Sequence, residues 1–152
     1  EELSSAFKTY TVDSRKAQSA RERRQDRMMD GLVADISASA PDKFGDRLAQ
    51  LVRDHPDIEC LFVLDDRGVQ ITDTVWGSSH KVRPNSLFRP SMKWTDHSMK
   101  DYFFLLQDTF VTLARTEPYI SQASGTLCVT LSGLFRDAQN NNHVLCVDLP
   151  IK

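Results

Sequence analysis

The sequence of 152 residues has little of what marks fibrous, disordered or membrane-spanning chains. It contains only six glycines and six prolines, which excludes collagen-like and low-complexity proteins. It has no run of 18 apolar residues, so no segment is expected to cross a bilayer as a helix, and its first residues show no secretory signal pattern. Apolar residues make up 40% of the chain, which is enough for the core of one folded domain.

A strong charge of one sign and a paired set of cysteines are also missing. Nineteen Lys and Arg against 21 Asp and Glu leave a net charge of −2, which does not favour nucleic acid or an anionic membrane as partner. The cysteines are Cys60, Cys128 and Cys146, and an odd number excludes a fully paired disulfide framework. Each lies in an apolar, strand-like stretch, so we expect three buried free thiols. A disulfide across neighbouring strands and a redox sensor are the alternatives.

The sequence has no recognisable catalytic or metal-binding motif. It lacks a phosphate-binding glycine loop, a Gly-x-Ser-x-Gly elbow, a His-Glu-x-x-His pair and a Cys-x-x-Cys pair. No two of the histidines share a helix face at the spacing of metal ligands. These histidines are His55, His80, His97 and His143. The sequence therefore predicts neither an enzyme nor a metal site, and it calls for no cofactor.

A long amphipathic helix is the first feature that the sequence does contain. Apolar residues recur at helical spacing from Leu3 to Ala38, but the middle of this stretch is polar and basic. A domain of this size cannot bury such a helix, so we expect it to project as a stalk or to pair with a second copy. The basic residues lack interleaved aromatics and a recognition fold, so we interpret them as a solvated face rather than a nucleic-acid site. We divide the chain into residues 1–38, the stalk, and residues 39–152, one globular domain.

The globular part alternates strand-like and helical segments. The expected elements are a helix over residues 41–54, strands over 58–64, 69–75, 117–121, 126–135 and 144–149, and a helix that starts from a capping box at Ser98–Asp101. Neighbouring strands joined by turns favour antiparallel pairing. The fold class is therefore α+β, with one antiparallel sheet of about five strands and helices against it.

One carboxylate lies in an unexpected place on the last strand. Asp148 shares a face with Val144 and Cys146, and Thr130 lies on the corresponding face of the neighbouring strand. A buried carboxylate needs a partner, because burying it unpaired is costly. Asp148 is therefore either solvated or paired with a lysine at the strand end, or it lines a partly polar pocket.

A pocket at Asp148 would be covered by the irregular segment over residues 76–102. Within it, Trp94, Lys100 and Tyr102 combine aromatic and cationic character, which suits a small polar ligand. If no ligand binds, Lys100 and Asp148 could instead pair with each other.

Several segments, taken in order, resemble a Cache domain, the PAS-like (PDC) sensory module of bacterial signal-transduction proteins. These segments are Ile58–Gly68, Ile71–Asp73, Asp96–Phe103, Glu117–Ser121, Gly125–Ser132 and His143–Leu149. The resemblance implies a single PAS-like sensor that is extracytoplasmic (periplasmic) and fused to an output module. That module would be a diguanylate cyclase of cyclic-di-GMP signalling, a phosphodiesterase, a histidine kinase or a chemoreceptor. Three free thiols leave a cytoplasmic location as the alternative.

The same resemblance implies roles for individual residues. Lys100 stands where such domains often have Arg and would bind a ligand carboxylate as a point charge. Tyr102 and Tyr119 match aromatic pocket positions, and Asp148 matches the acidic residue near the end of the last strand. The implied partners are a small molecule, such as a carboxylate, and a second copy bound through the N-terminal helix. The alternatives are a ligand-free dimerisation module and a haem or redox sensor of PAS type.

Overall fold

In the computed structural model, residues 2–77, 87, 89–108 and 110–151 are described, with side chains from residue 19 onward. The elements are α1 (Glu2–Ser37), η1 (Pro41–Lys43), α2 (Phe44–Asp54), β1 (Cys60–Leu64), β2 (Val75–Trp76), α3 (Asp101–Phe104), η2 (Leu105–Gln107), β3 (Leu113–Arg115), β4 (Tyr119–Ile120), β5 (Leu127–Arg136) and β6 (Asn142–Pro150). No helix in these ranges is both long enough and apolar enough to cross a membrane.

The strands form one antiparallel sheet in the order β2-β1-β6-β5-β3, and β4 pairs with β5 outside this path. The hairpin of β5 and β6 lies at its centre and is paired from Cys128–Pro150 to Arg136–Asn142. The α+β class and the antiparallel sheet predicted from the sequence are confirmed. The sheet has six strands where about five were expected, because the chain around β3 and β4 forms two short strands.

The two faces of the sheet are buried by different elements. The strict alternation in β5 and β6 sends Leu131 and Leu145 to the face covered by α1 and α2, where they join the larger core cluster. On the other face, Phe62 and Cys146 pack against α3 and η2 in a smaller cluster. The cavity described below lies on this second face, next to the smaller cluster.

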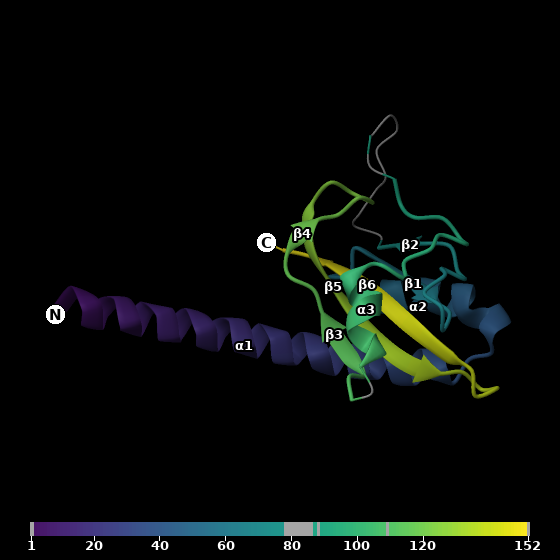
Figure 1. Ribbon diagram of the computed structural model, residues 1–152, viewed down its shortest axis with the longest axis horizontal. Coiled ribbons are helices and arrows are strands. Elements are labelled where there is room, and N and C mark those ends of the chain that lie inside the picture. The colour runs from purple at the N-terminus through teal and green to yellow at the C-terminus, as the bar shows by residue number, and fades with distance from the viewer. Residues whose placement is uncertain (1, 78–86, 88, 109, 152) are drawn as a thin grey trace.

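Helix α1 runs along the sheet at its C-terminal end and extends far beyond the domain at its N-terminal end (Figure 1). The projection predicted from its polar middle is confirmed, whereas pairing with a second copy stays a prediction. From residue 19 to the end of α1, the buried side chains are those of Met29, Leu32 and Ile36. The division of the chain at residue 38 also stays a prediction.

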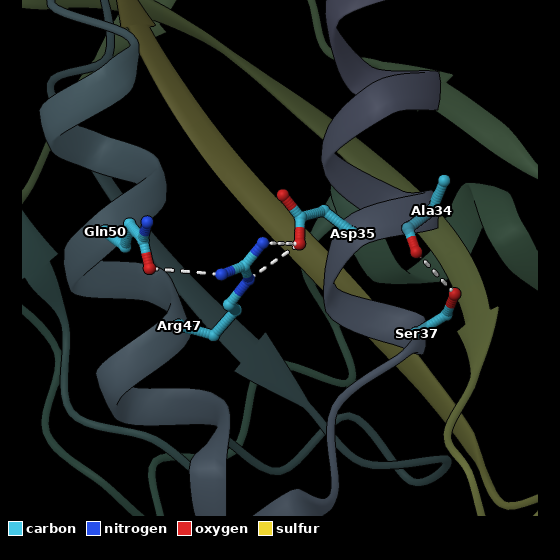
Figure 2. A network of polar contacts seen from close by, with 5 residues as sticks. All are labelled: Ala34, Asp35, Ser37, Arg47 and Gln50. Carbon is cyan, nitrogen blue, oxygen red and sulfur yellow. Dashed lines mark hydrogen bonds and ion pairs between the residues drawn. The ribbon is translucent and has the colours of Figure 1, made fainter.

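A polar contact joins the end of α1 to α2 (Figure 2). Arg47 on α2 donates from Nε to Asp35 Oδ1 at 2.6 Å, and its Nη2 pairs with the same oxygen. Arg47 also donates to Gln50 Oε1 at 3.0 Å, which orients the guanidinium along its own helix. The pair is about one-third exposed, so it fixes the angle between the helices more than it adds stability.

Gly133 on β5 allows α1 to approach the sheet closely. A Cβ at this position would lie 2.7 Å from Cγ2 of Val33 on α1. We therefore expect Gly133→Ala to destabilise the domain by about 1–3 kcal/mol in urea unfolding, because the helix must shift away. Gly31→Ala is the matched control: it lies in α1 with open space around its Cβ, and should stabilise by about 0.5–1 kcal/mol. Equal effects of the two variants would contradict this account.

Two local predictions between β1 and α3 are wrong. Residues 69–75 do not form a full strand beside β1, and only Val75–Trp76 is strand. The Thr72 hydroxyl, instead of a backbone carbonyl, accepts the hydrogen bond of Val63 N at 3.1 Å, so the ladder breaks there. The capping box at Ser98–Asp101 is also absent, because the N-cap is Lys100 and makes no side-chain cap.

Candidate functional site

A cavity of about 320 Å³ opens on the second face of the sheet, between the strands and the covering segment. Its walls come from β1 and β6, from residue 74 and residues 89–102, and from β4 with the turn after it. The lining residues are Cys60, Phe62, Thr74, Arg89, Ser91, Thr95, Asp96, His97, Lys100, Tyr102, Tyr119, Ile120, Ser121, Gln122, Ala123 and Asp148. The pocket expected at Asp148 is therefore present. Residues 78–86 and 88 of the expected cover lie outside the described residues.

Asp148 forms the buried polar wall of this cavity and is 5% exposed. It accepts a hydrogen bond from the Thr130 hydroxyl at 2.7 Å and one from the Cys60 thiol at 3.4 Å. Burial raises the pKa of its carboxyl to about 6, although these two donors oppose the shift. Among the residues that the structure describes, no cation pairs with this carboxylate. A ligand cation would supply one.

Tyr119 joins this wall from β4. Because the single hydroxyl proton of Thr130 goes to Asp148, the contact between Thr130 and Tyr119 requires the tyrosine to donate. The Tyr119 oxygen then has only lone pairs left to offer a ligand. Burial raises the pKa of Tyr119, so the phenol keeps its proton.

His97 and Tyr102 form the opposite wall, with a proton arrangement that the neighbouring Gln70 determines. The Gln70 amide nitrogen donates to Thr72 O at 2.8 Å, so its oxygen faces His97 Nε2 at 2.9 Å. His97 therefore carries its proton on Nε2, and Nδ1 accepts from the Tyr102 hydroxyl at 2.5 Å. Desolvation, aided by the nearby Lys100 charge, lowers the pKa of His97 to about 4, so the ring is neutral at pH 7.

Two cations lie at the mouth of the cavity. Lys100 and Arg89 both line it and both are exposed. Arg89 is anchored through its backbone, whose N–H donates to Gln122 O at 2.9 Å across the mouth. The ion pairs within the described ranges do not include one between Lys100 and Asp148. The alternative in which these two residues simply pair with each other is therefore not realised.

The structure brings together most, but not all, of the predicted site residues. Lys100, Tyr102, Tyr119 and Asp148 line the cavity. Thr130 lies behind Asp148 and acts on the wall through its hydroxyl.

Trp94 does not line the cavity. It is 68% exposed, its ring is contacted by Lys93 Nζ at 4.9 Å from the centroid, and its backbone has a positive φ of 79°. That conformation, rare for a bulky residue, turns the side chain away from the cavity.

Sequence reasoning missed Arg89, His97 and Gln70. His97 was available as the one histidine inside the segment Asp96–Phe103 that carries the family resemblance. Arg89 and Gln70 had no such signal, because nothing in their local pattern indicates that the covering segment folds back over β1.

All three cysteines are unpaired and buried. The register of β5 and β6 opposes Cys128 to Pro150 and Cys146 to Ser132, so a disulfide between these strands is geometrically excluded. Burial raises the pKa of the Cys128 thiol to about 12 and that of Cys60 and Cys146 above the usual range. These thiols are therefore poorly suited to redox sensing.

Thiol titration should count three thiols in the unfolded, unreduced protein and show slow reaction in the native one. A count of one in the unfolded protein would mean that a disulfide forms in solution.

The chain was also compared with known proteins. No model of a known protein family matches the sequence, and no curated protein matches it. Solved structures do. The Campylobacter jejuni chemoreceptor Tlp3 sensory domain with isoleucine bound has a TM-score of 0.62 and 17% identity, over 88% of this chain and 53% of that one. The Bacillus subtilis YkuI protein, with an EAL domain, has a TM-score of 0.62 and 19% identity, over 93% of this chain and 35% of that one.

A third similar structure is the extracellular ligand binding receptor from Desulfohalobium retbaense, with a TM-score of 0.61 and 14% identity over 88% of this chain and 23% of that one. The chain thus spans about half or less of the length of these proteins. At such identities the likeness concerns the fold. The chain has the α+β, PAS-like fold of bacterial Cache-type sensory domains, as its sequence predicted.

Proposed function

We propose that this chain is the ligand-binding sensory domain of a bacterial signal-transduction protein and that it binds a small zwitterion in the cavity at Asp148. The observation that carries the proposal is the proton arrangement of the cavity wall. Asp148 and Tyr119 on one side of the cavity and Tyr102 on the other all offer acceptors, because both tyrosine protons are already donated inside the protein.

A ligand ammonium fits this wall better than any neutral group. Its N–H donors suit acceptors on both sides of the cavity, and its charge balances the Asp148 carboxylate, which pairs with no cation among the described residues. A hydroxyl could donate to only one of these acceptors. The wall therefore selects for a primary amine.

The cations at the mouth of the cavity favour a second, negatively charged group on the ligand. Lys100 and Arg89 are donors with positive charge, so a carboxylate at that end would complete a zwitterion. A cavity of about 320 Å³ is at the small end of ligand sites, which suits a metabolite rather than a peptide. The amino acids bound by similar structures, isoleucine and L-valine in Tlp3, are supporting examples.

The wider assignment follows from the same fold. We infer that the domain lies outside the cytoplasmic membrane and controls a fused output module, since one similar structure is an extracellular receptor and another belongs to a protein with an EAL domain. Dimerisation through α1 remains part of the proposal. A haem sensor is not favoured, because His97 in the cavity wall uses both ring nitrogens in hydrogen bonds.

A thermal-shift screen tests the ligand class. L-valine, glycine and other zwitterions should raise the melting temperature, whereas isobutylamine and isovalerate, which each lack one charged group of valine, should raise it much less. A zwitterion at 100 times its Kd stabilises by about 2.7 kcal/mol, which is a shift of several degrees. If no zwitterion, amine or carboxylate shifts the melting temperature, the proposed function is wrong.

Lys100→Ala provides the matched test of the mouth. It should remove most of the zwitterion-induced shift and leave the free protein at its original melting temperature, because Lys100 is exposed and pairs with no carboxylate within the described ranges. Lys93→Ala is the control: Lys93 lies over the Trp94 ring, outside the cavity, and should keep the full shift. Equal ligand-induced shifts of the melting temperature in the two variants would mean that Lys100 does not bind the ligand.

A further inference from the structure

Arg115 on β3 holds α1 at the place where the helix leaves the domain. Its guanidinium donates to Asp26 Oδ1 at 2.9 Å, to the Gln25 side-chain oxygen and to the backbone oxygen of Glu22 at 3.2 Å. The side chain of Arg115 is 22% exposed, and from residue 19 onward the first buried position of α1 is Met29. Arg115 therefore clamps the half-buried turn of the helix that precedes its buried turns.

The same segment that carries this clamp also forms the cavity wall. Arg115 and Tyr119 are four residues apart, a distance of at most about 14 Å along an extended chain. Between them, Thr116 N donates to Thr130 O and Thr130 N donates to the Thr116 hydroxyl, both at 3.0 Å. Thr130 is also the residue whose hydroxyl contacts Tyr119 and Asp148. The clamp and the wall thus share one hydrogen-bonded unit.

We propose that Arg115 couples occupancy of the cavity to the attachment of α1, so that a filled cavity holds the turn at residues 22–26 more firmly. The ligand side of this inference rests on the proposed function, whereas the coupling between wall and helix does not. Arg115 acts here as a positioning residue, because it touches α1 and not the ligand.

A filled cavity should strengthen the attachment of α1, and not weaken it, because β4 is only weakly held in the sheet. It pairs with β5 through only two residues, Tyr119 with Cys128 and Ile120 with Leu127. So short a ladder is marginal by itself, and the contact of the Tyr119 hydroxyl with Thr130 adds to it. A ligand that donates to Tyr119 would hold β4 further against β5 and keep Arg115 in place. By reciprocity, releasing α1 would weaken ligand binding by the same factor.

Hydrogen exchange of the ligand-free chain tests the coupling without any ligand. Arg115→Gln should speed exchange of the α1 amides at residues 22–28 by about fivefold or more. Tyr119→Phe, a change in the cavity wall, should speed the same amides by several-fold. The double variant should be no faster than Arg115→Gln alone, because both changes break one connection. If Arg115→Gln unfolds the domain, Arg115→Lys is used in its place, because it keeps the charge but loses the branched guanidinium. It should exchange the same amides faster than the wild type, but by less than the fivefold expected of Arg115→Gln.

Tyr102→Phe is the matched control for the wall. It removes a phenol hydroxyl from the same cavity, but the Tyr102 hydroxyl donates to His97 Nδ1 and is not bonded to Thr130. It should leave exchange in α1 unchanged. Equal effects of Tyr119→Phe and Tyr102→Phe, or additive effects of Arg115→Gln and Tyr119→Phe, would reduce the clamp to a local structural contact and overturn the proposal.

The ligand arm uses L-valine as probe. If L-valine raises the melting temperature and slows α1 exchange in the wild type but not in Arg115→Gln, the coupling reaches the ligand. If it raises the melting temperature and leaves α1 exchange unchanged, the coupling is wrong while the proposed function stands. If no zwitterion binds, the proposed function fails, and the ligand-free variants still decide the coupling.

Discussion

Replacing Asp148 by Asn is expected to abolish zwitterion binding and, at the same time, to make the ligand-free domain more stable at pH 7. Both effects have one cause. The folded domain holds this carboxylate in a buried site where the described residues give it two neutral donors, and burial raises its pKa to about 6. A neutral amide of the same shape avoids that penalty, but it cannot balance the charge of a ligand ammonium.

The magnitudes follow from the pKa shift and from buried charge pairs. Raising a carboxyl pKa by about two units corresponds to at most about 3 kcal/mol at pH 7, which Asp148→Asn would regain in part. Loss of a buried, charge-assisted contact weakens binding by about 100-fold or more. Urea unfolding and calorimetric titration with L-valine measure the two effects separately.

Asp96→Asn is the control for this prediction. Asp96 also lines the cavity, but it is exposed, and the backbone N–H of Ser98 lowers the pKa of its carboxyl. The ionised form is therefore stabilised there, and its neutral replacement should not stabilise the fold. An Asp148→Asn variant that is less stable than the wild type would show that the carboxylate is a structural partner.

The alternation of β5 and β6 is the part of the fold that the sequence specifies most directly. Leu131 and Leu145 face one side, and Thr130 and Asp148 face the other, as the period of two requires. Because both faces are buried, a slip by one residue would place Asp148 in the apolar core under α1 and α2. The hydrophobic pattern therefore determines the register, and the register places the carboxylate in the cavity.

The chain between β1 and α3 could not be predicted in the same way, because polar side chains replace backbone partners there. Residues 69–75 alternate like a strand, but Gln70 and Thr72 are buried and make the decisive bonds through their side chains. Gln70 N also donates to Thr95 O at 2.9 Å, a contact between segments 25 residues apart in the chain. Local pattern carries no information about such a partner, so it could not place Arg89 in the site, and His97 was indicated only by the segment that carries the family resemblance.

Trp94 shows a related limit. Its aromatic character in the covering segment made it a reasonable ligand contact, yet its orientation depends on a positive φ and on the bond from its N–H to Gln70 O at 2.7 Å. Nothing in the sequence requires a tryptophan to adopt this conformation, which glycine favours. The hydrogen bond from Trp94 N–H to Gln70 O fixes this backbone conformation, and the ring then lies outside the cavity.

The stability of the wild-type domain is expected to change little between pH 4 and pH 6 through its two cavity groups, because they act in opposite directions. The pKa of Asp148 is raised to about 6, so the folded state binds more protons than the unfolded chain and stability falls as the pH rises through this range. The pKa of His97 is lowered to about 4, so the unfolded chain binds more protons and stability rises with pH. Each contribution is at most about 3 kcal/mol.

Single variants should separate the pH dependence of stability due to Asp148 from that due to His97. In Asp148→Asn, His97 remains, and stability should increase as the pH rises from 4 to 6. In His97→Gln, whose amide offers one donor and one acceptor as the neutral imidazole does, Asp148 remains and stability should decrease over the same range. Glu59, whose charge disfavours ionisation of Asp148, and Lys100, whose charge disfavours that of His97, are present in both. Every other titrating group is common to the two variants, so the difference between their slopes in urea unfolding isolates this pair. Parallel slopes would mean that the cavity wall does not hold Asp148 and His97 in the protonation states deduced from its hydrogen bonds.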